Sequence, residues 1–92
     1  MSKRKLIQDE LVSYLENNSD KFNAPYGVLI SLDAVKSGGK VRRITFGVAR
    51  YLDATITIWS ENKIQIDGRG GLAWKYQGDY NSKEGVIQAL SQ

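Results

Sequence analysis

The chain of 92 residues contains neither cysteine nor histidine. Without cysteine there are no disulfides, thiolate zinc sites or cysteine nucleophiles. Without histidine the chain lacks the usual general base near neutral pH, which excludes the Ser-His-Asp triad and histidine-ligated metals. A reaction would need Asp, Glu, Lys or Tyr in a deep cleft, for which so short a domain has little room. We therefore expect a protein that is not an enzyme and that holds no metal and no cofactor.

Long apolar runs are also missing. No run approaches the roughly 18–20 residues of a membrane-spanning helix. The start, Met1-Ser2-Lys3-Arg4-Lys5, is basic, but Asp9 and Glu10 follow too soon for a signal peptide. A single proline, 41% hydrophobic residues and 25% charged residues are typical of an ordered globular domain. We expect one soluble, cytoplasmic domain over residues 1–92, with no membrane partner.

The first segment predicts an amphipathic helix over residues 3–17. Its apolar residues recur at i, i+4, i+7 and i+8 and form one stripe, namely Ile7, Leu11, Tyr14 and Leu15. The cations of Lys3-Arg4-Lys5 would oppose the helix dipole in the first turn. The helix therefore begins later, near Leu6, with a frayed start before it, or these charges serve a partner.

From Tyr26 onward the apolar period changes to two, which predicts strands. The alternation assigns to the core Val28, Ile30, Leu32, Ile44, Phe46, Val48, Ala54, Ile56, Ile58, Ile64 and Ile66. Residues 36–40 and 61–62 are predicted turns, and residues 67–71 a flexible loop. A fifth strand is predicted over residues 72–77, with Leu72, Trp74 and Tyr76 on one face and Trp74 in the core.

A short helix is predicted to end the chain. Asn81 is the predicted N-cap with Glu84 at the third position, and Val86, Ile87 and Leu90 form the buried side. The predicted fold class is α+β: an N-terminal helix, a five-stranded antiparallel meander and a short C-terminal helix, with the helices on one sheet face. A small closed β-barrel with flanking helices is the alternative. A monomer or a homodimer is expected.

Positive charge is concentrated in the predicted hairpin. No acidic residue lies between Asp33 and Asp53, whereas that interval holds the cations Lys36, Lys40, Arg42, Arg43 and Arg50. The resulting field would attract phosphates or an acidic protein surface. Alternatively, these cations only protect an edge hairpin from association with other sheets.

Two further residues are candidates for contact with a ligand. Trp59 is in phase with the threonines of its strand, so it is predicted on the sheet face without helices, beside Arg43, where it could stack on a base. The alternative is that it closes a second small core. Arg69 lies in an Arg-Gly-Gly triplet of the kind that RNA-binding tails repeat, although the glycines could simply turn the chain.

These patterns predict a small binding module that engages nucleic acid or a nucleoprotein through a basic hairpin. The predicted site residues are Lys36, Lys40, Arg42, Arg43, Arg50, Trp59 and Arg69. The alternative is a protein-interaction inhibitor, such as a phage or mobile-element anti-defence factor of the anti-CRISPR kind. Such a factor would act on a host protein by protein–protein contact, and this basic chain would need an acidic or mixed target surface.

Overall fold

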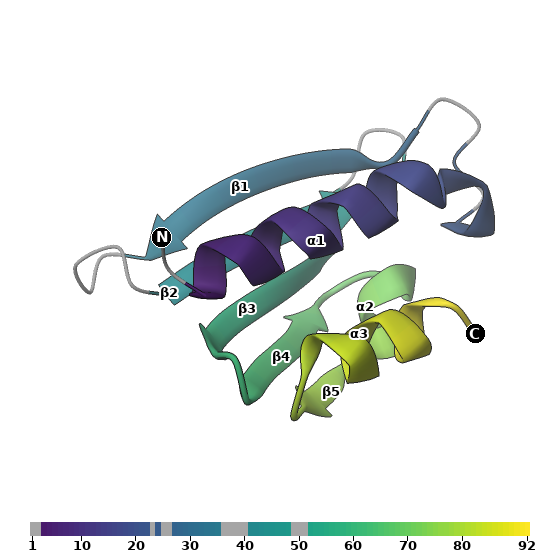
Figure 1. Cartoon of the computed structure of the whole chain (residues 1–92). Coiled ribbons are helices and arrows are strands. Elements are labelled where there is room, and N and C mark those ends of the chain that lie inside the picture. Colours follow the sequence, from purple (N-terminus) through teal and green to yellow (C-terminus); the bar gives the residue numbers. More distant parts are fainter. Residues whose placement is uncertain (1–2, 23, 25–26, 36–40, 49–51) are drawn as a thin grey trace.

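A five-stranded antiparallel sheet forms the centre of the domain (Figure 1). The computed structural model describes residues 3–22, 24, 27–35, 41–48 and 52–92, with the backbone alone for residues 33–35. Its elements are α1 (Lys3–Asn17), the 3-10 helix η1 (Ser19–Phe22), β1 (Leu29–Val35), β2 (Val41–Gly47), β3 (Ala54–Ser60), β4 (Lys63–Gly68), α2 (Gly71–Tyr76), β5 (Gly78–Tyr80) and α3 (Lys83–Leu90).

The strands follow one another across the sheet in chain order, β1-β2-β3-β4-β5, and every neighbouring pair is antiparallel. β1 and β5 remain as the two edges, so the sheet does not close. The predicted α+β meander is therefore confirmed, and the alternative of a closed barrel is wrong.

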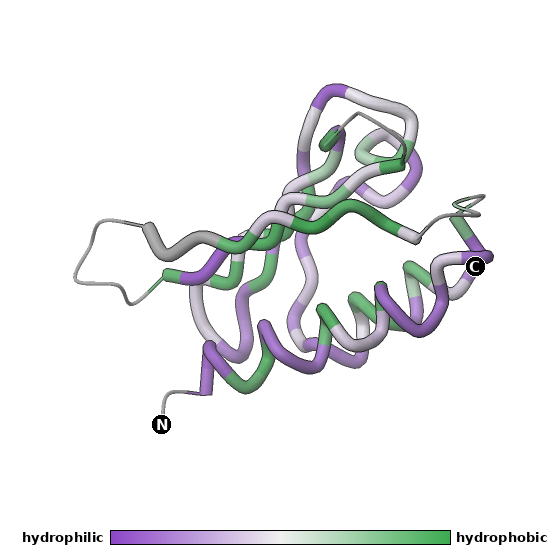
Figure 2. Tube along the Cα trace, turned by 90° about the horizontal axis from the view of Figure 1, so that it is seen from above, coloured by the Kyte–Doolittle hydropathy of each residue, from purple (hydrophilic) through white to green (hydrophobic). Residues whose placement is uncertain are grey.

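Two helices cover one face of this sheet. α1 runs along β2 and β3, and α3 lies beside it near β5 (Figures 1 and 2). Most of the predicted core is buried: Ile7, Leu11, Leu15, Ile44, Phe46, Ala54, Ile56, Ile58, Ile64, Ile66, Val86 and Leu90. The predicted core residues Tyr14, Val48 and Ile87 are partly buried and pack against it. Within the described residues, no helix has the length and apolar composition needed to cross a bilayer.

The predicted core of the first strand is only partly correct. Val28 and Ile30 pack against the core. Leu32 lies opposite the buried Ile44 and therefore on the same sheet face, yet 51% of its surface is exposed. The reason is that α1 covers β2 and β3, which leaves the edge strand β1 beyond the helix.

The predicted strand over residues 72–77 is wrong. The chain forms α2 there, and the fifth strand is instead the short β5. Ala73 and Tyr76 are buried at helical i, i+3 spacing, and the Tyr76 ring meets the Phe22 ring edge-on at 6.0 Å. Trp74 was predicted in the core, but on the outer side of this helix it is 67% exposed. A short apolar run fits the strand period of two as well as the helical period of about 3.6. Here the helix is the form in which Tyr76 packs against Phe22.

The predicted N-cap of the last helix is also wrong by one residue. Ser82 is the cap, and its hydroxyl accepts a hydrogen bond from the backbone N–H of Gly85 at 3.1 Å. Asn81 precedes the cap and is exposed. Both residue types cap helices well, so the tertiary position of α3 decides between them.

The segment predicted as a flexible loop, residues 67–71, is a close-packed corner. It comprises the end of β4, a bend and the first residue of α2. Asp53 packs directly against it: its Oδ2 accepts the backbone N–H of Leu72 at 3.3 Å. A Cβ at Gly70 would overlap the Asp53 side chain, and Gly68 has a φ of +141°. These two glycines therefore allow a close approach as well as a turn.

Candidate nucleic-acid interface

The sheet face opposite α1 and α3 is polar. Its side chains follow the strand register, in which Arg43 pairs with Thr57 and Thr57 pairs with Gln65. In the next row, Thr45 pairs with Thr55, and their hydroxyl oxygens lie 3.5 Å apart. We call this surface the uncovered face. Thr57 is buried within it, whereas the half-buried Thr45, Thr55, Gln65 and Arg43 carry hydroxyl, amide and guanidinium groups that can exchange hydrogen bonds with a ligand.

Trp59 projects from the uncovered face near the end of β3, with 41% of its surface exposed. Its indole Nε1–H points to Gln65 Oε1 at 3.4 Å. Lys63 Nζ lies 5.7 Å from the centre of the ring, within range of a cation–π interaction. The site thus combines a partly exposed aromatic ring with an ammonium group over it.

Two side chains of helix α1 form hydrogen bonds with the backbone of the site, from the covered side of the sheet. The buried side chain of Gln8 donates through Nε2 to the carbonyl oxygen of Arg43 at 3.1 Å. Arg4 donates through Nε to the carbonyl oxygen of Trp59 at 2.9 Å. Two turns of one helix therefore fix the strand positions from which Arg43 and Trp59 extend.

Cations converge at this end of the domain. The contact between Arg4 and the Trp59 carbonyl brings the basic start of α1 to the end of β3. Glu61, in the turn beside it, has an ion pair with Lys3 at 3.4 Å. Carboxylate residues also belong to these rows of the sheet: Asp33 lies opposite Arg43, Asp79 opposite Gln65 and Asp67 opposite Thr55. Two cations thus contact Trp59 directly, Arg4 at its carbonyl oxygen and Lys63 at its ring.

The N-terminal cations do not prevent the first helical turn. α1 begins at Lys3, so the expectation of a later start near Leu6 is wrong. Each cation of this turn has a partner: besides the contacts of Lys3 and Arg4, Lys5 pairs with Asp9 at 2.6 Å. These contacts oppose the unfavourable interaction of the cations with the helix dipole.

The structure brings together only some of the predicted site residues. Arg43 and Trp59 share the uncovered face. Arg42 is the next residue along the strand and shares the face of Ile44; among the described residues, its buried Nε has no hydrogen-bond partner. Lys36, Lys40 and Arg50 lie outside the described residues.

Arg69 lies at the other end of the sheet. It follows Gly68, which pairs with Ala54 at the start of β3, whereas Trp59 is near the end of that strand. At about 3.3 Å per residue, the two positions are separated by roughly 16 Å along the strand. Arg69 therefore does not join the cluster around Trp59.

Sequence reasoning missed four residues that shape this site: Lys63, Gln65, Arg4 and Gln8. The two-residue turn at 61–62 was predicted, and it returns Lys63 opposite Ser60, close to Trp59. The signal for Lys63 and Gln65 was therefore present in the alternation. Contacts from α1 depend on how the helix crosses the sheet, which periodicity does not specify.

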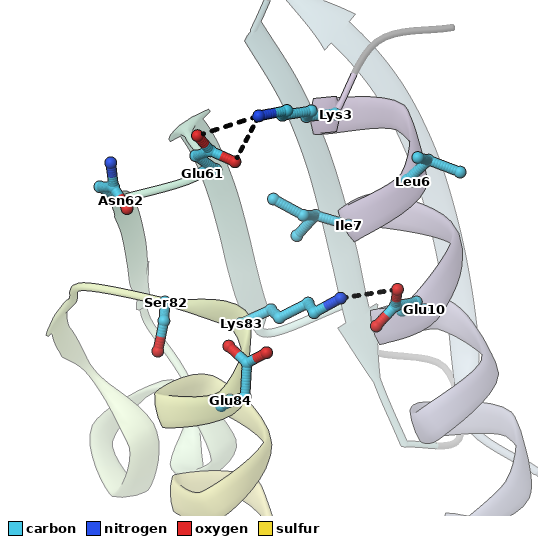
Figure 3. Close-up of a pocket in the computed structure, with 9 residues that line it drawn as sticks. All are labelled: Lys3, Leu6, Ile7, Glu10, Glu61, Asn62, Ser82, Lys83 and Glu84. Carbon is cyan, nitrogen blue, oxygen red and sulfur yellow. Dashed lines mark hydrogen bonds and ion pairs between the residues drawn. The ribbon is translucent and has the colours of Figure 1, made fainter.

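A separate hollow of about 300 Å³ lies where α1, α3 and the β3–β4 turn meet (Figure 3). It gathers the carboxylates of Glu10, Glu61 and Glu84, the pattern that a carboxylate enzyme would require. Glu10, however, pairs with Lys83 at 2.7 Å, and this hydrogen bond raises the pKa of Lys83. With the Lys3–Glu61 pair, these contacts connect α1, α3 and the β3–β4 turn, and they pair two of the three carboxylates with lysines.

Among the residues that the structure describes, no group of three side chains is arranged to hold a metal ion. The groups best placed to meet a ligand are those of the uncovered face around Trp59. No protein-family model, curated protein or solved structure matches this chain, so any function must be argued from its own residues.

Proposed function

We propose that this domain is a non-enzymatic module that binds single-stranded nucleic acid, free or within a nucleoprotein, through its basic hairpin and the uncovered face. The observation that carries the proposal is the exposed ring of Trp59, which has Lys63 over it and contacts Gln65, in the same row of the sheet as Arg43. An unpaired base can stack on this ring while the cations meet the neighbouring phosphates.

The fold supports this arrangement energetically. A ligand gains most from groups that are already ordered, because their conformational entropy has been lost on folding. The contacts of Gln8 and Arg4 order the backbone at Arg43 and Trp59. The hydroxyl groups of Thr45 and Thr55 can form further hydrogen bonds with a nucleic-acid strand that crosses the uncovered face. A duplex would hide its base faces from the indole, which favours single strands.

Tryptophan fluorescence tests the proposal. Trp74→Phe leaves Trp59 as the sole tryptophan, because the chain contains two. Stacking of a base should quench this emission when a single-stranded oligonucleotide of about 12 residues is added. The matched control is Trp59→Phe, in which Trp74 on α2 is the sole tryptophan.

The expected result is strong quenching in the Trp74→Phe protein and little change in the Trp59→Phe protein. Binding is measured in parallel by the anisotropy of the labelled oligonucleotide. Tight binding without quenching of Trp59 would show that the strand lies elsewhere on the domain. An absence of binding at low salt to single strands of either DNA or RNA would refute the function itself.

A second candidate function is inhibition of a host protein by direct contact, as an anti-defence factor would do. The exposed Trp74 and Leu52, on α2 and beside Asp53, favour this possibility because large exposed apolar side chains often anchor protein interfaces. Affinity capture from a nuclease-treated host lysate separates the two candidates. A stoichiometric protein that survives the nuclease favours the inhibitor, and loss of all partners favours the nucleic-acid module.

A further inference from the structure

The outer edge of β1 is unusually suited to pairing with another strand. Among the described strands, β1 pairs with β2 alone, so seven residues keep one backbone edge unpaired. Leu29 and Leu32 lie on opposite faces of this strand and are 42% and 51% exposed. The other edge differs, because β5 has only three residues and includes Asp79. Short, charged edges resist association, and long apolar edges favour it.

Nothing in β1 itself blocks such pairing. The segment Leu29–Val35 contains no proline and no lysine or arginine, and Asp33 is its sole charge. Figure 1 shows α1 below β1, while no described helix or strand runs along the outer edge between its two ends. Among the described residues, no other strand pairs with the backbone groups of this edge, so an incoming strand can offer them hydrogen bonds.

We propose that β1 pairs antiparallel with β1 of a second copy of this chain, around a twofold axis that passes through Leu32. An isologous contact of this kind requires a surface that complements itself. With Leu32 on the axis, all seven residues pair: Leu29 meets Val35, Ile30 meets Ala34 and Ser31 meets Asp33 of the other copy. In this register apolar residue types pair with apolar ones, and the one acidic position pairs with a serine position.

Other registers fit less well. An axis at Asp33 would place two aspartates directly opposite each other, where like charges destabilise a strand pair. An axis at Ser31 would pair Leu29 with Asp33 and leave Ala34 and Val35 without partners. A shift by one residue also moves each apolar side chain relative to the core face. The sequence of β1 thus favours the register with the axis at Leu32 when β1 pairs with itself.

This pairing would join two sheets into one of ten strands, with both uncovered faces on the same side. In β1–β2, Arg43 lies opposite Asp33, one residue from the axis, so the two copies of Arg43 would flank the junction. A single strand pair buries less than the roughly 800 Å² per partner of a standard interface, so we expect a dimer with a dissociation constant on the order of 10–100 µM. The dimer does not depend on nucleic-acid binding and can fail independently of it.

Disulfide trapping tests the register directly, because the chain has no cysteine of its own. In Leu32→Cys, the two new thiols would lie directly opposite, with Cα atoms about 4.5–5.5 Å apart, within disulfide range. In the control Ser31→Cys, the thiols would be diagonal neighbours about 7–8 Å apart, beyond easy bridging. Under mild oxidation, Leu32→Cys should form the covalent dimer at least about tenfold faster. Equal rates would overturn the proposed axis.

Sedimentation velocity over a series of protein concentrations measures the dissociation constant of the dimer and tests whether the β1 edge forms the interface. Leu32→Lys places two ammonium groups across the axis and should raise the dissociation constant of the dimer at least about tenfold. Trp74→Lys removes a more exposed side chain far from the edge and should leave the constant unchanged. A wild-type protein that stays monomeric at about 0.5 mM, or a dimer that tolerates Leu32→Lys, would overturn the proposal. If Leu32→Lys unfolds the chain, the rates of disulfide formation in Leu32→Cys and Ser31→Cys test the proposal instead.

Discussion

Replacing Gly70 by alanine should lower the free energy of unfolding by about 3 kcal/mol. The new Cβ would overlap the side chain of Asp53, which packs directly on this glycine. Either the carboxylate or the bend must move, and overpacking of this kind costs about 1–3 kcal/mol. A moved carboxylate also loses the N–H of Leu72 at the start of α2, which adds about 1 kcal/mol. Chemical denaturation followed by circular dichroism measures the change.

Gly71→Ala is the matched control. A Cβ at Gly71 meets nothing within 4 Å, and the residue begins α2. Alanine favours helix over glycine by up to about 1 kcal/mol, so this protein should be as stable as the wild type or slightly more stable. If both variants lose the same stability, the close packing of Asp53 on Gly70 is not what holds this corner.

Trp59→Ala should weaken binding of a single-stranded oligonucleotide by about tenfold to a hundredfold. Loss of one base–aromatic stack costs about 1–3 kcal/mol. The fold should tolerate the change, since the indole is exposed and its contact with Gln65 is long at 3.4 Å. Trp74→Ala removes an indole that is still more exposed, and it should leave the affinity unchanged. Equal losses in the two variants would contradict a specific stack on Trp59.

The two neighbouring arginines distinguish the uncovered face from the rest of the hairpin. Arg43 shares this face with Trp59, whereas Arg42 lies on the face of Ile44. Arg43→Ala should therefore reduce affinity severalfold more than Arg42→Ala. Equal effects would indicate that the nucleic acid lies along the edge of the hairpin. An unchanged affinity in the double variant Arg42→Ala/Arg43→Ala would show that the hairpin does not contribute to binding.

Much of the fold could be predicted from periodicity. The stripe of Ile7, Leu11 and Leu15 and the alternation through Ile56 and Ile58 lie in elements with one clear period, and these residues are buried as expected. The segment from residue 71 to 80 lacked that clarity. Its apolar residues fit a strand as well as a helix, and the choice depends on Phe22 and Asp53, which are distant in sequence.

The candidate site could be predicted in part for the same reason. Strand parity predicted Arg43 and Trp59 on one face. The register places Arg43 in one row with Thr57 and Gln65, and the indole of Trp59 contacts Gln65. Strand parity also places Arg42 and Arg43 on opposite sheet faces, although the predicted site included both because of their charge. The contacts of Arg4 and Gln8 with the strands require the three-dimensional position of α1, so residue types and spacing were insufficient.

Salt dependence of oligonucleotide binding, compared between the wild type and Arg43→Ala/Lys63→Ala, tests most directly whether the uncovered face binds a nucleic-acid strand. Each phosphate contact contributes about −0.7 to the slope of log affinity against log salt for single strands. The wild type should lose affinity steeply between about 50 and 200 mM salt, and the double variant should show a slope shallower by about 1.4. A wild-type affinity that is independent of salt, or an identical slope in the variant, would contradict the proposal.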